Sequence, residues 1–143
     1  FRCGEVGHMT VVMDGKPCYC GKQGCLDAYC SASCLSDMTG GKLEQFFTGL
    51  KQGEKEFVDA WNMYITYLAV AINNIHMVLD CDIVLGGYVG SYAGDYIQDI
   101  WEKVSQRNTF EENTRYVQNC TYKVEAAAVG ASLRVIEMFV EQI

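Results

Sequence analysis

The residues most able to do chemistry gather near the start of the sequence, in the segment 7–30. Four of them have side chains of the types that bind transition metals: His8, Cys18, Cys20 and Cys25. Zinc prefers thiolate and neutral imidazole ligands in a tetrahedral arrangement. Cys18 and Cys20 alternate in sequence and so point to the same side, and Gly21 and Gly24 allow the chain to fold back. The pattern predicts a zinc site, and its alternative is three structural thiols beside a surface histidine.

The predicted metal site is structural rather than hydrolytic, because four protein ligands leave no open coordination position. The sequence holds 8 cysteines, an even number that would suit disulfides in a secreted chain. No basic flank and apolar core mark a signal peptide, so we expect a reducing cytoplasm. Cys30 and Cys34 follow helical spacing, and Cys81 lies in or beside a predicted buried strand. We expect these to be buried thiols.

Two carboxylates flank the predicted metal site. Glu5 comes three residues before His8, and Asp27 comes two residues after Cys25. Either acid alone is more often solvated, or caps a helix, and Asp27 stands where a helix begins. If a common metal holds them, both would converge with His8 on one polar pocket. Paired carboxylates suit sugar hydroxyls, since each carboxylate oxygen accepts hydrogen bonds in a fixed geometry.

A glycine-rich turn, "GGYVG" at 86–90, follows a predicted strand and precedes a helix. A nucleotide can approach the backbone at such a turn, which makes Gly86 and Gly87 candidate contacts. A tight strand-to-helix turn explains the glycines equally well. His76 lies in an apolar helical pattern and is expected to be a core histidine. No Ser-His-Asp or Cys-His pair appears, so no catalytic residue is assigned within this chain.

Hydrophobic periodicity predicts the elements that must position these residues. The expected order is a strand or hairpin edge (1–13), a loop (14–25), a short helix (26–38), a surface connection with one helical turn (39–56), a long helix (55–80), a buried strand (81–87), an amphipathic helix (92–108), a strand (116–125) and a last helix (125–143). The long helix is apolar on more than one face and is therefore expected to be central. A strand that runs into glycines and a helix is typical of an α/β fold.

Composition excludes some classes of function. The net charge is −7, and the 11 Lys and Arg residues are scattered, so these 143 residues lack the basic surface that binds nucleic acid. No apolar run reaches the ~20 residues that span a bilayer, so no membrane partner is expected. The sequence does not begin with Met, and it starts directly with a β-leaning segment. We therefore expect an N-terminal part to be missing.

The motifs resemble a known family. "GEVGHMTV" followed by "CYCGKQGCLDAYCS" is similar to the paired signature of the ROK family (repressor, open reading frame, kinase), ExGH and then CxCGxxGCxE. "DIVLGGYVG" and "EAAAVGASLRVIEMF" resemble the family's nucleotide-side turn and closing helix. The resemblance covers nearly the whole chain. It implies an α/β fold of the actin-like, ribonuclease-H-like ATPase type, in which 1–143 is the C-terminal sugar-binding and zinc domain and the last helix packs towards the N-terminal part.

The resemblance also implies roles for single residues. His8, Cys18, Cys20 and Cys25 would bind zinc, and Glu5, His8 and the acid at position 27 would contact sugar hydroxyls. The sequence departs from the family pattern at two places. Asp27 stands where Glu is usual, and Tyr88 stands where the kinases carry a third glycine in the nucleotide-side turn.

Two functions follow from the resemblance. The first, which these departures favour, is the sugar-sensing domain of a dimeric or tetrameric transcriptional regulator that contacts DNA only through a missing winged-helix domain. The alternative is the C-terminal half of an ATP-dependent, glucokinase-like sugar kinase, whose phosphate loop and catalytic Asp would lie upstream. A stand-alone zinc-stabilised module is a third possibility, and the open start of the chain argues against it.

Overall fold

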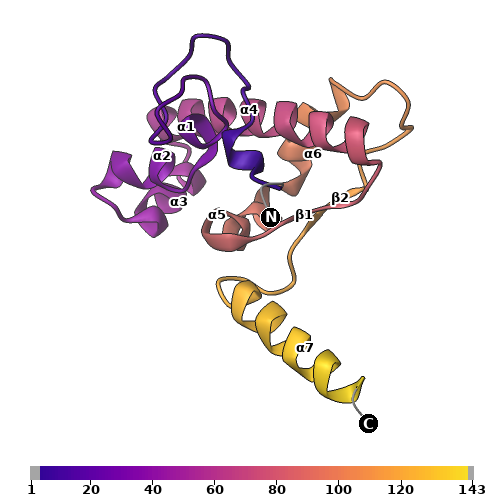
Figure 1. Cartoon of the computed structure of the whole chain (residues 1–143). Helices are drawn as coiled ribbons and strands as arrows, with labels where there is room; N and C mark the ends of the chain where they lie inside the picture. Colours follow the sequence, from indigo (N-terminus) through magenta and orange to yellow (C-terminus); the bar gives the residue numbers. More distant parts are fainter. Residues whose placement is uncertain (1–3, 142–143) are drawn as a thin grey trace.

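Helix α4 (Lys55–Leu79) is the central element of the computed structural model, which describes residues 4–141, and α1, α3 and α6 contact it (Figure 1). Its buried side chains follow helical spacing: Trp61, Tyr64, Ile65, Ala69, Ala71 and Ile72. The helix ends at Asp80, which adopts the left-handed conformation with φ 47°. The predicted central helix over 55–80 is therefore confirmed to within a residue.

The segment between the metal loop (residues 14–25, which carry the three predicted cysteine ligands) and α4 forms a series of short helices (Figure 1). They are α1 (Asp27–Cys30), α2 (Ser33–Ser36), the 3-10 helix η2 (Asp37–Thr39) and α3 (Leu43–Lys51). The prediction of one helix over 26–38 is wrong, because Ser31 is extended at ψ 158° and breaks it. Cys30 and Cys34 consequently lie on separate helices.

Helix α3 corrects a second expectation. The glycine-bounded segment 39–56 is predicted as a surface connection, but Phe46, Phe47 and Leu50 are buried in the main core. The rings of Phe46 and Phe57 meet edge to face with centroids 5.2 Å apart. The flanking glycines mark the ends of this helix rather than an exposed loop.

The sheet consists of two parallel strands, β1 (Ile83–Leu85) and β2 (Val117–Asn119), in the register Ile83↔Val117 to Leu85↔Asn119. Parallel strands need a long crossover, and α5 (Gly87–Ala93), η3 (Gly94–Tyr96) and α6 (Ile97–Ser105) supply it. Both predicted strands are confirmed, but β1 is only partly buried and Cys81 is exposed, contrary to expectation.

The predicted amphipathic helix over 92–108 exists in pieces. The 3-10 turn η3 separates α5 from α6. The expected apolar stripe is nevertheless correct, because Ile100 and Val104 are fully buried and Tyr92 and Tyr96 pack against the same core. The stripe faces α4, with which α6 is in contact.

The N-terminal segment does not form the predicted strand. Within the described residues, the 3-10 helix η1 (Val6–His8) stands in its place. The residues after η1 pair with the cysteine loop through the isolated bridge Thr10↔Cys25 and through hydrogen bonds from the backbone N–H groups of Val11 and Val12 to Gly24. Residues 1–3 of that prediction, with Cys3, lie outside the described residues. His8 therefore projects from a tight helical turn and not from a strand edge.

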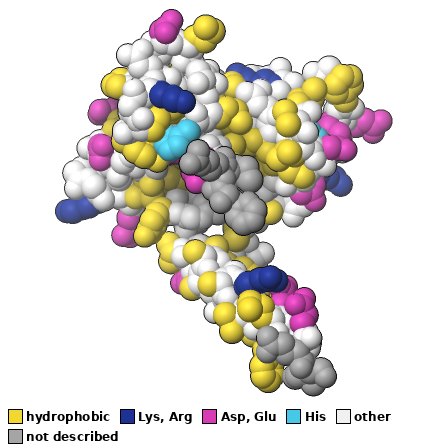
Figure 2. Space-filling model, viewed as in Figure 1, with side chains coloured by type: hydrophobic (Ala, Val, Ile, Leu, Met, Phe, Trp, Pro, Cys, Tyr) yellow, Lys and Arg dark blue, Asp and Glu magenta, His cyan; other side chains and the backbone are white. Residues whose placement is uncertain are grey.

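Helix α7 (Ala126–Val140) extends away from the body of the molecule (Figure 1). Apolar side chains remain exposed along it (Figure 2), among them Leu133, Val135, Ile136 and Phe139. The predicted last helix is confirmed over 126–140, and its packing towards a further domain stays a prediction. Among residues 4–141, no helix is long and apolar enough to cross a membrane.

The buried position of Phe46 gives a test of this core. Phe46 is 0% exposed, whereas Phe110 is 79% exposed. Phe46→Ala should lower the free energy of unfolding by ~3–5 kcal/mol, because it removes buried apolar area and leaves a cavity. Phe110→Ala should change it by less than ~1 kcal/mol. Urea denaturation measures both values, and equal losses would contradict the core described here.

Candidate metal centre and adjoining polar site

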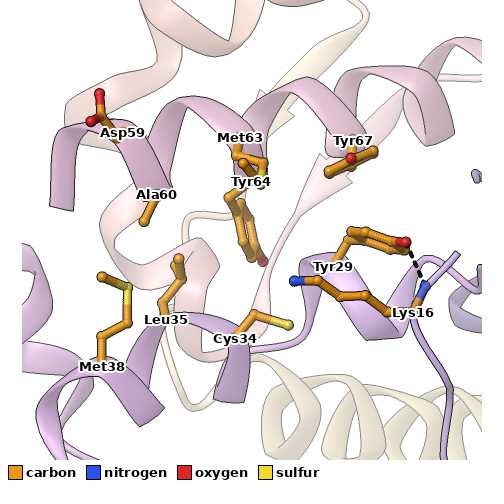
Figure 3. A pocket seen from close by; sticks show the side chains of 10 residues that line it. All are labelled: Lys16, Tyr29, Cys34, Leu35, Met38, Asp59, Ala60, Met63, Tyr64 and Tyr67. Atoms are coloured by element: carbon orange, nitrogen blue, oxygen red, sulfur yellow. Dashed lines mark hydrogen bonds between the residues drawn. The ribbon is translucent and has the colours of Figure 1, made fainter. Parts of the chain in front are cut away.

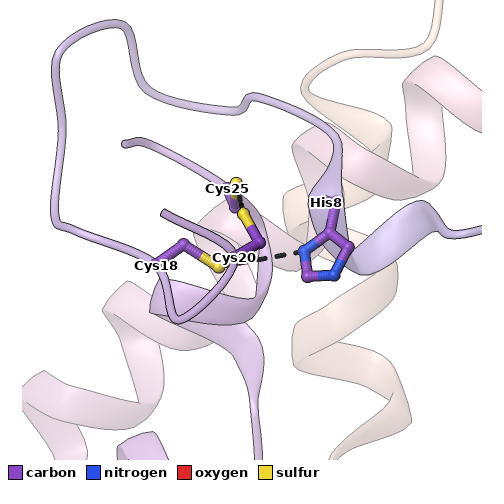
Figure 4. Close-up of side chains that lie close together, drawn as sticks. All are labelled: His8, Cys18, Cys20 and Cys25. Carbon is purple, nitrogen blue, oxygen red and sulfur yellow. Dashed lines mark hydrogen bonds between the residues drawn. The ribbon is translucent and has the colours of Figure 1, made fainter. Parts of the chain in front are cut away.

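The four predicted ligands lie together (Figure 4). The ligand atoms of His8, Cys18, Cys20 and Cys25 all lie within 4.8 Å of one another. The Sγ atoms of Cys20 and Cys25 are 3.7 Å apart, and Sγ of Cys18 lies 3.8 Å from Nδ1 of His8. The structure thus brings the whole predicted set to one point, although His8 comes from η1 and the cysteines come from the loop.

The spacing of these atoms fits a tetrahedral ion. Ligands bonded at about 2.0–2.3 Å to a tetrahedral zinc lie about 3.5–3.8 Å from one another. The two separations of 3.7 and 3.8 Å agree with such edges. Disulfide sulfurs are only about 2.05 Å apart, and each cysteine between residues 4 and 141 is free. Three thiols and one imidazole with this spacing are suited to zinc.

The thiols of the cluster differ in acidity. Burial raises the pKa of the Cys25 thiol to about 11. A hydrogen bond from the backbone of Lys22 is the main cause that lowers the pKa of the Cys20 thiol. A divalent cation among these sulfurs would favour the thiolate form of both, because it supplies positive charge at bonding distance.

The loop that carries the cysteines is anchored to α1 by Tyr29. The backbone N–H of Lys16 donates a hydrogen bond of 2.7 Å to the Tyr29 hydroxyl, as Figure 3 shows. Tyr29 is buried, and it lines a pocket of about 270 Å³ between the loop, the short helices and α4. Lys16 in turn accepts a hydrogen bond of 2.9 Å from the backbone N–H of Gly24. One buried tyrosine therefore links both sides of the metal loop to the core.

Gly24 occupies a position that no other residue fits. Its φ is +77°, and a Cβ atom there would collide with the carbonyl oxygen of Val12. Its carbonyl accepts a hydrogen bond of 2.8 Å from the backbone N–H of Val11. Gly21 also has positive φ, +85°, but a Cβ there would meet open space. The close approach at Gly24 is what lets Cys25 return to the cluster.

The second ring nitrogen of His8, Nε2, lies beside a polar group formed by Tyr19 and Asp27. Its Nε2 lies 3.3 Å from the hydroxyl of Tyr19, and that hydroxyl donates a 3.0 Å hydrogen bond to Oδ2 of Asp27. Tyr19 has one hydroxyl proton, and it uses that proton in the hydrogen bond to Asp27. A neutral His8 must therefore donate a hydrogen bond from Nε2 to the Tyr19 oxygen. Its Nδ1 is then unprotonated and faces Cys18, which is the state that binds a metal.

Asp27 is held against the backbone of η1. It is the first residue of α1 but caps no backbone N–H with its side chain. A Cβ added to Gly7 would lie 2.5 Å from Oδ1 of Asp27, so the carboxylate rests on the glycine backbone. The glycine of the ExGH motif thus makes room for the acid that stands two residues after the last cysteine.

Glu5 is less clearly part of this group. Its carboxylate is exposed and forms no hydrogen bond within the described part of the chain. Its charge is one of the smaller causes that raise the pKa of Tyr19, after the main cause, the hydrogen bond to Asp27. The structure therefore brings His8 and Asp27 together and leaves Glu5 at the edge of the group.

Tyr19 is the residue that sequence reasoning missed. Its place between two cysteine ligands is the only signal in the sequence, and that place alone does not reveal a hydrogen bond to Asp27. Beside it, Tyr19 and Asp27 line a surface pocket of about 280 Å³ that also includes Ser31 and Asp37. Asp27 lines this pocket and His8 does not, and the volume is sufficient for a small polar molecule.

The glycine turn of 86–90 has a structural explanation. Gly87 has φ +73°, and a Cβ at Gly90 would lie 2.9 Å from the carbonyl oxygen of Leu85. Tyr88, the departure from the kinase pattern, is 70% exposed. Contacts of Gly86 and Gly87 with a nucleotide stay a prediction.

His76 has polar partners, as predicted, but it is only partly buried and does not belong to the core that was expected to contain it. Its Nδ1 lies 3.0 Å from the carbonyl oxygen of Cys81, and its ring stacks on Tyr116 at 3.8 Å. Its Nε2 lies 3.5 Å from Glu111, and Asp80 is also near. Both of these acids are exposed.

Fold and site together define a mixed α/β domain in which a His-Cys3 cluster adjoins a carboxylate. The model of the ROK family matches residues 2–137, and the chain belongs to that family. A curated relative, an N-acetylmannosamine kinase of Escherichia coli O6:H1, is 30% identical over 108 residues, which are 71% of this chain and 37% of the relative.

Solved structures of the family share the fold. A ROK family glucokinase from Streptomyces griseus, in complex with glucose and AMPPNP, has a TM-score of 0.70 at 23% identity over 89% of this chain and 49% of that chain. A ROK hexokinase from Thermus thermophilus has a TM-score of 0.75 at 23% identity over 94% of this chain and 49% of that chain. This chain therefore shares the fold of these two structures, and it spans about half the length of each.

Substitution of one cluster cysteine tests the metal centre. Cys20→Ser should reduce bound metal to background and lower the melting temperature, because one ligand is lost and the ion no longer stabilises the folded chain. Cys81→Ser replaces an exposed free thiol outside the cluster and should change neither. Elemental analysis and thermal unfolding measure the two effects. A folded natural protein that contains no metal would contradict the assignment.

A pair of glycine substitutions tests the loop. Gly24→Ala should destabilise the protein by at least ~2 kcal/mol more than Gly21→Ala, because both have positive φ but only the first meets backbone. Gly24→Ala should also release metal. Chemical denaturation and metal content measure the difference, and similar behaviour of the two variants would refute the close approach to Val12.

Proposed function

We propose that this chain is the C-terminal half of an ATP-dependent sugar kinase of the ROK family, with a structural zinc at His8, Cys18, Cys20 and Cys25. The observation that carries the proposal is the position of His8 between two groups. One ring nitrogen faces the cysteine cluster, and the other faces a polar group that contains Asp27. A single imidazole thereby couples a metal site to a hydroxyl-binding site.

The zinc would stabilise the loop and take no part in the reaction. It would tie η1, which carries His8, to the loop and to the start of α1, which carries Asp27. These segments bury little apolar surface of their own, because much of the loop is exposed. Coordination would supply the stability that hydrophobic packing does not provide there.

His8 and Asp27 would hold the sugar. Nε2 of His8 would donate to a sugar hydroxyl, and the carboxylate of Asp27 would accept from one. Glu5, which follows the family pattern, would contribute a further acceptor from the edge of the site. Asp27 is one methylene shorter than the usual Glu, and its support on Gly7 places it within reach of the Tyr19 hydroxyl, 3.0 Å away.

The phosphoryl donor and the catalytic base would come from outside this segment. The solved relatives that this chain resembles include a glucokinase with bound glucose and AMPPNP, and the curated relative is an N-acetylmannosamine kinase. These names support a sugar as acceptor and ATP as donor. Gly86 and Gly87 would lie on the adenosine side of the nucleotide, and no catalytic residue is assigned within the chain.

A sugar-sensing regulator is the second candidate, and the sequence alone favours it. The observations behind it are Asp27 in place of Glu and Tyr88 in the glycine turn. We now place the kinase first, because the relatives named above are kinases and the Tyr88 side chain is directed to solvent. A cytoplasmic location, a homodimer or tetramer, and DNA contact through a further domain stay predictions.

The kinase proposal is tested on the protein with its complete natural sequence. We expect ATP-dependent ADP formation with at least one of glucose and N-acetylmannosamine. Asp27→Asn should raise KM for the sugar by ~10- to 100-fold, because a charged hydrogen-bond acceptor is lost. Asp99→Asn, a change at an exposed acid on α6, should leave KM unchanged. A coupled ADP assay measures these values. Absence of ADP formation together with sugar-dependent DNA binding would support the regulator.

A further inference from the structure

The Tyr19 side chain lies across the two groups that would bind the sugar. Its hydroxyl is 3.3 Å from Nε2 of His8 and 3.0 Å from Oδ2 of Asp27. Its ring meets the His8 ring edge to face with centroids 5.1 Å apart. The residue nevertheless remains 83% exposed. A phenol that is mostly in solvent therefore occupies the polar centre of the site.

The hydrogen bonds of Tyr19 have the same direction as those of a bound sugar hydroxyl. The phenol accepts from Nε2 of His8 and donates to Asp27, so it uses one donor and one acceptor at a single oxygen. A sugar hydroxyl that bound between His8 and Asp27 would make the same pair of bonds. His8 has only one proton on Nε2, so it cannot donate a full hydrogen bond to the Tyr19 oxygen and to the sugar oxygen at the same time.

The surroundings allow Tyr19 to leave. Its side chain forms no other hydrogen bond within residues 4–141, and His8 is the one aromatic ring in that range with which it is paired. The tyrosine stands at the rim of the 280 Å³ pocket that Asp27 also lines. Rotation of the exposed ring into solvent would open that pocket towards His8 without a change in the core.

We propose that Tyr19 is a specificity-determining residue whose hydroxyl occupies the place of a sugar hydroxyl in the free protein. A sugar binds by displacing it, and only a sugar that places a hydroxyl between Nε2 of His8 and Oδ2 of Asp27 does so. This inference rests on the proposed sugar site. The observed Kd for the sugar is then the intrinsic Kd divided by the fraction of free molecules in which Tyr19 is displaced, so affinity is weakened.

The test compares Tyr19→Phe with the natural protein, both with the complete natural sequence, by calorimetric titration with glucose and with N-acetylmannosamine. Phenylalanine keeps the ring contact with His8 and removes the competing hydroxyl. For the sugar that binds, we expect Kd to fall by ~5- to 10-fold, from the loss of two net hydrogen bonds in the free state. Tyr122→Phe, a change at an exposed tyrosine outside the site, should leave Kd unchanged.

The possible results are distinct. An unchanged or higher Kd in Tyr19→Phe would overturn the role of Tyr19 and leave the sugar site standing. If neither protein binds either sugar, the proposed sugar site fails and this inference fails with it. Metal content of Tyr19→Phe should match that of the natural protein, and its melting temperature without sugar should fall only slightly, because the free state loses the two hydrogen bonds of the Tyr19 hydroxyl. Loss of metal would instead assign Tyr19 a structural role in the loop and overturn the proposal.

Discussion

The position of one imidazole ring joins the cysteine cluster to the polar group at Asp27. His8 must direct Nδ1 towards the cysteine cluster and Nε2 towards Asp27. The hydrogen bond from Tyr19 to Asp27 accounts for the proton on Nε2, and that proton leaves Nδ1 free as a ligand. A change in the orientation of this ring would therefore affect the metal site and the polar site together.

The parts of the molecule that position His8 and its partners are stabilised in different ways. The helices α3, α4 and α6 share a core of aromatic and aliphatic side chains, which excludes water without any metal. The loop lies outside that core and depends on directed interactions: the bond from Lys16 to Tyr29, the bond from Gly24 to Lys16, and the close approach of Gly24 to Val12. Tyr29 connects the two regions. The proposed metal would consequently contribute most to stability where burial is least.

The functional interpretation changed for a physical reason as well as through the relatives. At the level of sequence, the shorter acid Asp27 and the bulky Tyr88 appear to weaken the sugar site and the nucleotide turn. In the structure, Gly7 lets the Asp27 carboxylate approach η1 closely, and Tyr88 is directed to solvent. Kinases among the relatives then favour catalysis over regulation as the function to test first.

The sequence by itself determined which four side chains form the cluster, the long helix and the family, because each depends on residue types at short spacing or on periodicity. Ligand convergence needs only a tight turn and two cysteines in alternation, and the apolar repeat of 55–80 identifies α4 directly. The tertiary structure alone decided that Phe46 and Phe47 are core residues, that η1 replaces a strand, and that Tyr19 contacts Asp27. These features depend on which segments meet in space. Local propensity does not encode such contacts, since glycines around α3 and an exposed tyrosine in a turn are compatible with several arrangements.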